Sequence, residues 1–162
     1  MTTLASLTLR PATEADRELL LSIYASTREL ELSRVPWSAA EKQAFVHMQF
    51  EAQHKHYHLH FDDAEFSIIV ADGRPAGRLY VQRRRDENRI VDITVLPAYR
   101  NAGIGTSFLQ QLMAESRAAD KPLRIHVEHE NPARSLYERL GFRELELNGI
   151  YYLLEWRASA VS

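Results

Sequence analysis

The stretch from Ile90 to Ala118 constrains the fold more than any other part of this sequence. It opens with a β-branched run, Ile90 to Val95, which ends before Pro97 because proline has no backbone donor for a sheet. It continues with a predicted amphipathic helix from Ile104 to about Ala118, whose apolar residues repeat with helical spacing. A short turn with two glycines joins them. The chain must therefore pack a strand, a sharp turn and a helix around one core.

The turn from Arg100 to Thr106 has the properties of an anion-binding site. Its sequence is Arg100-Asn101-Ala102-Gly103-Ile104-Gly105-Thr106. The first amides of a helix have no intrahelical acceptor, and the positive end of the helix dipole favours a phosphate there. Gly103 and Gly105 allow an anion to approach closely, and Arg100 can add charge-assisted hydrogen bonds. A Gly-x-Gly pair at a helix start is also a common packing device, so a structural role stays open.

Two better-known phosphate loops do not match this turn. The dinucleotide-binding fingerprint needs a third glycine, and the nucleoside triphosphate loop needs Gly-Lys followed by Ser or Thr. The turn has neither the glycine nor the lysine. The pattern therefore disfavours an NAD or ATP site.

The remaining elements follow from periodicity, capping signals and turn dipeptides. A capping box at Ser38 and Glu41 predicts a helix from about Ala39 to about His58, and Asp72-Gly73 predicts a hairpin. We expect further strands at 7–9, 65–70, 77–81, 123–127, 142–147 and 150–156, a helix after Thr13, and a short helix opened by Asn131-Pro132 and closed at Leu140-Gly141. Residues 29–37 show little periodicity, and residues 159–162 are expected to fray.

Composition limits the class of protein. A chain of 162 residues with 45% hydrophobic and 26% charged residues suits one globular domain, here taken as 1–162. The net charge of -2 gives no overall attraction to nucleic acid or membrane, so we expect neither as a partner. Without cysteine, catalysis through a thiol is excluded, and a reducing compartment fits. The sequence shows no secretory signal, and we expect a cytoplasmic location.

Two blocks of the sequence resemble the GNAT superfamily of acyl-CoA-dependent N-acyltransferases. The first is the strand and turn Ile93-Thr94-Val95-Leu96-Pro97-Ala98-Tyr99-Arg100 leading into Gly103-Ile104-Gly105, which matches the family's Arg/Gln-x-x-Gly-x-Gly/Ala signature. The second is Asn131-Pro132-Ala133-Arg134-Ser135-Leu136-Tyr137-Glu138-Arg139-Leu140-Gly141-Phe142, similar to the family's short helix after its fifth strand. Weaker likeness at Leu9 to Thr13 and through Gly77 extends the resemblance over nearly the whole chain.

The resemblance implies a fold and a cofactor-binding mode. The fold would be α/β (mixed α+β), with a mostly antiparallel central sheet, helices on both faces, and an opening between the fourth and fifth strands. Acetyl-CoA would be the cosubstrate, with no metal. The amides from Gly103 to Thr106 would hold the CoA diphosphate, Ile93 and Val95 would pair with the pantetheine like an added strand, and Asn131 would hydrogen-bond the same arm.

The resemblance also implies the catalytic groups. Transfer from a thioester to an amine needs a base, an oxyanion donor and an acid for the departing thiolate. Tyr137 stands where the family often places that acid; its other interpretation is a core aromatic. The base is undecided among Asp92, Glu128 and His126. Strand alternation puts the side chain of Asp92 on the face opposite Ile93, where it can instead pair with Arg89 or with an arginine across the sheet.

The acceptor is a small-molecule or peptide amine that the sequence does not identify. In this family the first helices commonly wall the acceptor site, so Glu29 and Glu31 are candidates to attract a cationic amine and Trp37 to face it. The preferred function is N-acetylation by direct attack in a ternary complex, because there is no cysteine to carry the acetyl group. The alternative is a catalytically inactive acyl-CoA-binding module with a sensing or assembly role.

Three other features of the sequence concern possible metal, RNA and protein partners. The histidines at positions 54, 56, 58 and 60 have i, i+4 spacing, but no cysteine or carboxylate at matching spacing completes a zinc set. Arg83-Arg84-Arg85 precedes two acidic residues, which is typical of a solvated turn rather than an RNA site. Family members often form homodimers, and exposed strand edges in the C-terminal hairpin would allow this.

Overall fold

The computed structural model describes residues 4–158, which contain one seven-stranded sheet. The strands lie in the order β1-β2-β3-β4-β5-β7-β6, and all neighbours are antiparallel except β4 and β5, which are parallel. Their bounds are β1 Leu7–Pro11, β2 Glu65–Ala71, β3 Arg74–Arg83, β4 Asn88–Val95, β5 Leu123–Glu128, β6 Arg143–Asn148 and β7 Tyr151–Trp156.

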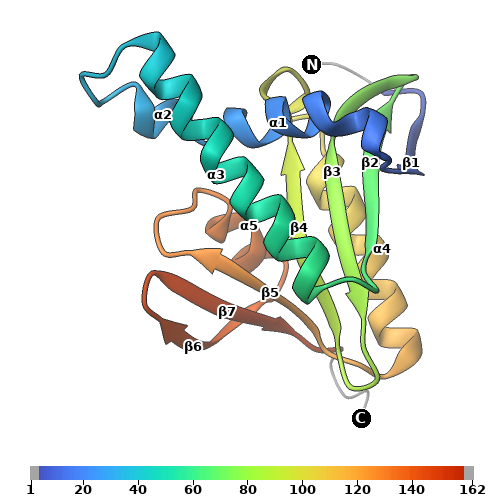
Figure 1. The fold of residues 1–162 in the computed structure, drawn as a ribbon. Helices are drawn as coiled ribbons and strands as arrows, with labels where there is room; N and C mark the ends of the chain where they lie inside the picture. Colours follow the sequence, from blue (N-terminus) through green and yellow to red (C-terminus); the bar gives the residue numbers. More distant parts are fainter. Residues whose placement is uncertain (1–3, 159–162) are drawn as a thin grey trace.

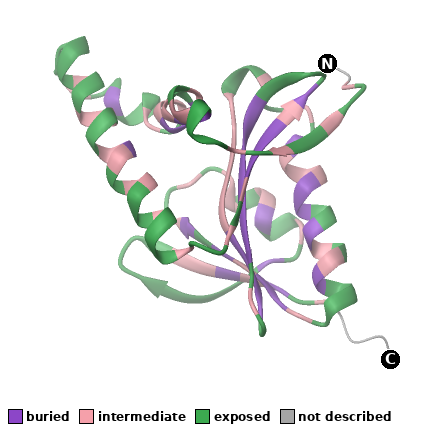
Figure 2. Ribbon diagram, turned by 45° about the vertical axis from the view of Figure 1, so that its right-hand side comes forward, coloured by how far each residue is buried: buried purple, intermediate pink, exposed green. Residues whose placement is uncertain are grey.

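Helices cover both faces of this sheet (Figure 1). One face carries the 3-10 turn η1 Glu14–Asp16, then α1 Arg17–Ser26, α2 Glu29–Leu32 and α3 Ala39–His60; the other carries η2 Pro97–Tyr99, α4 Ile104–Ala119 and α5 Arg134–Arg139. Buried residues gather in the central strands and on the inner side of α4, whereas β6 is exposed along its whole length (Figure 2). None of the helices in residues 4–158 has the length and apolar character needed to cross a bilayer.

The predicted fold class is confirmed, and several local signals are confirmed with it. Ser38 and Glu41 form the capping box that starts α3, with the Glu41 amide donating to Ser38 Oγ at 3.1 Å. Asp72 and Gly73 both adopt positive φ, at 49° and 80°, in the turn between β2 and β3. The expectation for residues 159–162 lies outside the described residues.

Two local details go beyond the expectations. The weakly periodic segment after α1, for which no helix is predicted, contains the one-turn helix α2, whose Leu32 is buried. The predicted short helix is present as α5 but its regular part begins at Arg134, two residues after Pro132; the side-chain oxygen of Asn131 accepts from the Ala133 amide at 2.9 Å, as a capping side chain does.

The feature that positions the site is the separation of β4 from β5. The two strands pair only over Asn88↔Leu123, Arg89↔Arg124 and Ile90↔Ile125, and then run apart (Figure 1). Immediately beyond Ile90, the register between β3 and β4 shifts, so that Tyr80 faces Asp92 while Val81 faces Ile90, and Val91 is the extra residue. The bulge reverses the alternation, so Ile93 packs in the same core as Ile90.

Gly77 lets β3 and β4 approach each other where the sheet carries the site. A Cβ at this position would overlap the carbonyl oxygen of Thr94 on β4. Gly105, by contrast, has nothing within 4 Å of the place where its Cβ would stand, and its φ is not positive.

We predict that Gly77→Ala lowers the free energy of unfolding by about 1–3 kcal/mol, because backbone atoms cannot move aside without disturbing the sheet. Chemical denaturation measures this, with Gly105→Ala as the control that retains wild-type stability. Equal stability of the two variants would contradict the packing described for Gly77.

Candidate active site

The turn before α4 presents six consecutive amides without an acceptor. Between Arg100, whose amide donates to the Pro97 carbonyl, and Ser107, whose amide donates to that of Gly103, no N–H from Asn101 to Thr106 donates a hydrogen bond to any described residue. Such amides normally find a partner in the protein, in water or in a ligand. The positive end of the α4 dipole lies at the same place, so an anion is the partner that fits.

The backbone of this turn is shaped to expose those amides. Asn101 and Gly103 both have positive φ, at 62° and 78°, and Gly103 is the N-cap of α4. Ile104 is 2% exposed and fixes the helix start in the core, while Ala102 packs at its margin. Because no protein atom fills the space beside Gly105, that space is free for a phosphate oxygen.

The edge of β4 beyond Ile90 has backbone groups that face no strand. The Leu96 amide donates to the Ala76 carbonyl at 2.8 Å, so Leu96 points toward β3. Backbone groups alternate in direction along a strand, so those of Ile93 and Val95 point to the side from which β5 has departed. The Val95 carbonyl there accepts from Arg100 Nε at 3.1 Å. This edge and the amide turn form one continuous strip of available backbone groups.

Tyr137 lies in the core beside that opening. It is 4% exposed, and its ring meets Phe142 edge to face at 5.5 Å. Burial, followed by the negative charge of Asp92, raises the pKa of its hydroxyl. Tyr137 therefore keeps its proton at neutral pH and can donate it.

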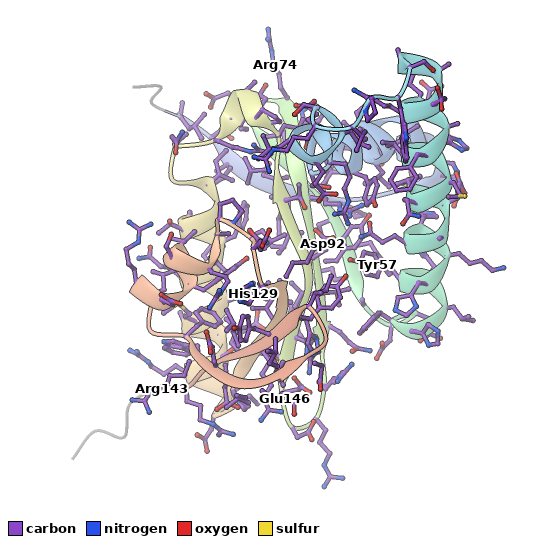
Figure 3. All side chains as sticks on the ribbon, turned by 90° about the vertical axis from the view of Figure 1, so that its left-hand side faces the viewer. Tyr57, Arg74, Asp92, His129, Arg143 and Glu146 are labelled. Carbon is purple, nitrogen blue, oxygen red and sulfur yellow. The ribbon has the colours of Figure 1, made fainter. Side chains whose placement is uncertain are left out.

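Asp92 is held by three donors on the α3 side of the sheet. Its Oδ2 accepts from Tyr57 Oη at 3.0 Å and from Arg78 Nη2 at 2.8 Å, and its Oδ1 accepts from Thr94 Oγ1 at 2.7 Å. Figure 3 shows Asp92 of β4 and Tyr57 of α3 next to one another. The arginine pairing foreseen for Asp92 is present, and its partner is Arg78 across the sheet.

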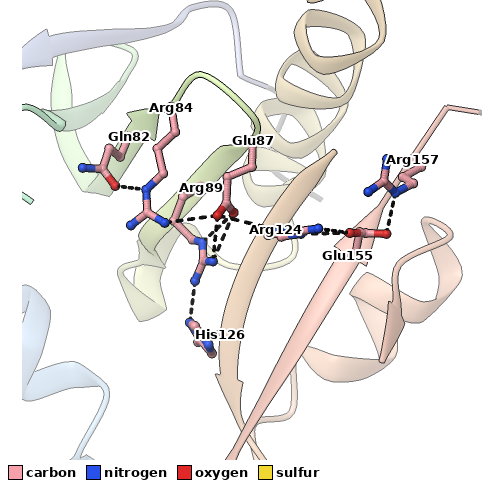
Figure 4. Close-up of polar contacts among 8 residues, drawn as sticks. All are labelled: Gln82, Arg84, Glu87, Arg89, Arg124, His126, Glu155 and Arg157. Atoms are coloured by element: carbon pink, nitrogen blue, oxygen red, sulfur yellow. Dashed lines mark hydrogen bonds and ion pairs between the residues drawn. The ribbon is translucent and has the colours of Figure 1, made fainter. Parts of the chain in front are cut away.

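His126 is joined to a buried charge network at the foot of β4 and β5 (Figure 4). Its Nδ1 lies 2.7 Å from Arg89 Nη1, and Arg89 also contacts Glu87, which is 6% exposed. Burial and then the charge of Arg89 lower the pKa of His126, so the ring is neutral near pH 7. Because a guanidinium only donates, Nδ1 must accept and the ring proton sits on Nε2. In this tautomer His126 presents a donor.

Glu128 ends β5 on the same face as His126 and is the least engaged of the three base candidates. Its Oε1 lies 3.5 Å from Arg28 Nη2, and its side chain is 36% exposed. Arg28 also bonds Tyr24 Oη at 3.1 Å and Glu31 at 2.8 Å. Glu128 thus has carboxylate lone pairs available for a proton.

Of the acceptor-side candidates, the structure links only Glu31 to these groups, through Arg28, which also contacts Glu128. Glu29 and Glu31 lie on α2, where Glu31 pairs with Arg28. Trp37 is 41% exposed and meets Phe45 edge to face at 5.3 Å. Asn131 uses its oxygen in the turn before α5, which leaves its amide nitrogen for another partner.

The histidines of α3 pack with one another and with neighbouring aromatics. His54 stacks on Phe50 with ring centroids 5.4 Å apart, and His58 stacks on Phe66 at 4.2 Å. Within residues 4–158 no three potential ligands gather in the geometry of a metal site.

Sequence reasoning missed Tyr57, Arg78 and Arg28. Arg78 is 2% exposed in the middle of β3, and a charged residue inside an otherwise apolar strand was the available signal. Tyr57 lies on a helix with a nearly even distribution of polar and apolar residues, and Arg28 meets a carboxylate 100 positions away. Neither the role of Tyr57 nor the contact of Arg28 with Glu128 can be recognised from the neighbouring residues in the sequence.

Comparison with known proteins agrees with this geometry. The family model of the acetyltransferase (GNAT) domain matches residues 62–144. A ribosomal protein bS18-alanine N-acetyltransferase of Haemophilus influenzae is 29% identical over 85 residues, covering 52% of this chain and 58% of that protein. An N-alpha-acetyltransferase of Sulfurisphaera tokodaii is 30% identical over 112 residues, covering 59% and 66%. The chain thus spans less than two thirds of either curated relative.

A solved structure extends the likeness to the whole fold. The PaiA N-acetyltransferase of Thermoplasma acidophilum, crystallised with coenzyme A, aligns with a TM-score of 0.71 at 16% identity, covering 94% of this chain and 99% of that one. At that identity the likeness concerns the fold alone. Together with the family match over half of the sequence, it shows that the chain belongs to the GNAT acetyltransferase family.

Proposed function

We propose that this protein transfers the acetyl group of acetyl-CoA to a primary amine by direct attack in a ternary complex. The observation that carries the proposal is the strip of unsatisfied backbone groups, in which six amides suit a diphosphate and the β4 edge suits the amides of pantetheine. Arg100 releases the Val95 carbonyl to the incoming pantetheine and turns to the phosphates.

The chemistry assigns two proton transfers to this chain. The acceptor arrives as an ammonium and loses a proton to Glu128, directly or through water, because Glu128 is the least engaged of the three base candidates, with one contact at 3.5 Å to Arg28. The amine nitrogen then forms a bond to the thioester carbon, and the carbon–sulfur bond breaks. Tyr137 gives its proton to the departing thiolate and recovers one from the new amide nitrogen. The products are the N-acetyl compound and CoA.

The acceptor class we propose is the α-amino group of a polypeptide. The support is the activity for which two relatives at about 30% identity are named: one is a ribosomal protein bS18-alanine N-acetyltransferase and the other an N-alpha-acetyltransferase. Glu29, Glu31 and Trp37, at the outer end of α2 and α3, are proposed to meet the residues that follow the acceptor amine.

We predict that Gly105→Ala weakens CoA binding at least tenfold, because the added methyl occupies the space open to a phosphate oxygen. Isothermal titration calorimetry measures the affinity. Gln110→Ala, on the exposed side of the same helix, is the control and keeps wild-type affinity. Equal affinity of both variants and the wild type would remove the diphosphate from this turn.

Tyr137→Phe should lower kcat roughly 100-fold and leave CoA affinity near that of the wild type, because only the proton donor is lost. Free thiol release with acetyl-CoA and a panel of peptides and small amines measures kcat. Unchanged turnover would refute the acid assignment. Tight CoA binding by the wild type without turnover on any amine would support the alternative, an inactive acyl-CoA-binding module.

The base assignment is tested by Glu128→Gln, which we predict to reduce kcat roughly 100-fold at pH 7. The loss should shrink as pH rises, because a growing share of the acceptor is already deprotonated. The matched control is Glu146→Gln, an exposed glutamate of β6. A Glu128→Gln variant with wild-type kcat across that range would contradict the assignment.

A further inference from the structure

Asp92 keeps one site for a ligand after its protein contacts are counted. A carboxylate offers about four lone-pair sites. Two on Oδ2 are taken by Tyr57 and Arg78, and one on Oδ1 is taken by Thr94, which leaves one on Oδ1 among the contacts within residues 4–158. The side chain is 13% exposed, so a molecule beside it can reach that oxygen.

The side chain of Asp92 is held in place by residues of both β3 and α3. Arg78 is 2% exposed, lies over the Tyr80 ring at 5.0 Å, and uses one nitrogen to bridge Asp92 and Gln53 of α3. Tyr57 comes from the same helix, one turn further on, and meets Tyr80 edge to face at 5.8 Å. A carboxylate held by an arginine and a tyrosine within an aromatic cluster has little freedom to turn.

Asp92 also lies at the opening between β4 and β5, where the proposed function places the acceptor nitrogen. It is the second residue of β4 beyond the last pair with β5, so it lies at the start of the opening. It follows the bulge at Val91, which turns its side chain to the face that carries α1 and α3. The positive charge of Arg78 compensates the negative charge of Asp92. The free oxygen of Asp92 can therefore accept an N–H hydrogen bond from the amine without strongly favouring the protonated form of that amine.

From these observations we infer that Asp92 binds the acceptor nitrogen, and that Tyr57 of α3 and Arg78 of β3 are positioning residues that hold its carboxylate for this purpose. One N–H of the amine donates to Asp92 Oδ1, which directs the nitrogen lone pair toward the acetyl carbon. The inference rests on the proposed function and adds how the acceptor is recognised: a primary amine can donate one N–H to Asp92 and still keep a basic lone pair, whereas an acylated nitrogen has a single N–H, a delocalised lone pair and an acyl group in the way.

Binding of a peptide to the enzyme saturated with CoA tests this without turnover. The probes are an alanine-initiated heptapeptide and its N-acetylated form, titrated by calorimetry. The wild type should bind the free amine at least tenfold more tightly than the acetylated peptide. Asp92→Asn should remove that difference, since its oxygen no longer carries charge and its nitrogen competes as a donor.

Asp92→Asn leaves the buried Arg78 without its carboxylate partner and could unfold the protein. Tyr57→Phe is therefore a second, milder variant, which removes only one hydrogen bond to Asp92. We expect Tyr57→Phe to raise the Michaelis constant for the peptide roughly 3- to 10-fold, with the constant for acetyl-CoA unchanged. Tyr152→Phe is the matched control; it packs with the other core and should match the wild type.

Three results would overturn the inference: equal binding of the two peptides by the wild type, a preserved preference in folded Asp92→Asn, or the same peptide constant in Tyr57→Phe as in Tyr152→Phe. They are distinguishable from failure of the proposed function. That failure appears as absence of thiol release with every amine, whereas the peptide preference is measured in the complex with CoA.

Discussion

β4 and β5 share only three residue pairs, and the backbone groups released by their separation are the ones on which the site depends. Hydrogen-bonding groups of a sheet interior are normally satisfied by the neighbouring strand. Here the side of β4 from Ile93 to Val95 has lost that neighbour, and the turn that follows leaves six amides unsatisfied before α4 begins. A cosubstrate with amides at one end and a diphosphate at the other, as proposed, would supply the missing partners. Its recognition would then be made largely by the backbone, with side chains assisting.

The bulge at Val91 sends the side chains of Asp92 and Ile93 to opposite faces of the sheet, where they make different contacts. It turns Ile93 toward the core formed with α4, so the strand remains anchored while its edge is open. It turns Asp92 toward the face covered by α3, where Tyr57 of α3 and Arg78 of β3 donate hydrogen bonds to its carboxylate. The proposed cosubstrate edge and the proposed acceptor carboxylate thus come from adjacent residues of one strand. Tyr137, the proposed proton donor, belongs to α5, and the charge of Asp92 contributes to the raised pKa of its hydroxyl.

The sequence was sufficient where a structure depends on local chemistry. The capping box at Ser38, the hairpin at Asp72-Gly73 and the glycine turn before α4 each need only a few neighbouring residues, and each was found. The family resemblance supplied the opening between the fourth and fifth strands. The bulge at Val91 has no local signature, because it follows from the register against β3.

Contacts between distant residues were likewise beyond sequence reasoning. Arg28 with Glu128, and Tyr57 with Asp92, depend on how α1 and α3 cross the sheet, and this follows from core packing rather than from any motif. The same limit explains why the base could not be chosen from the sequence. The contacts of Asp92, His126 and Glu128 differ in number and length, and Glu128 has the weakest of them.

The most direct test of the account is the amide spectrum of the turn in solution. A ¹H–¹⁵N correlation experiment on the labelled protein, titrated with CoA, follows the N–H groups from Asn101 to Thr106 one by one. If the turn holds the diphosphate, their proton resonances should move downfield together as the hydrogen bonds form, while those of amides in the middle of α4 stay in place. Saturation with CoA that leaves these resonances unmoved would contradict it.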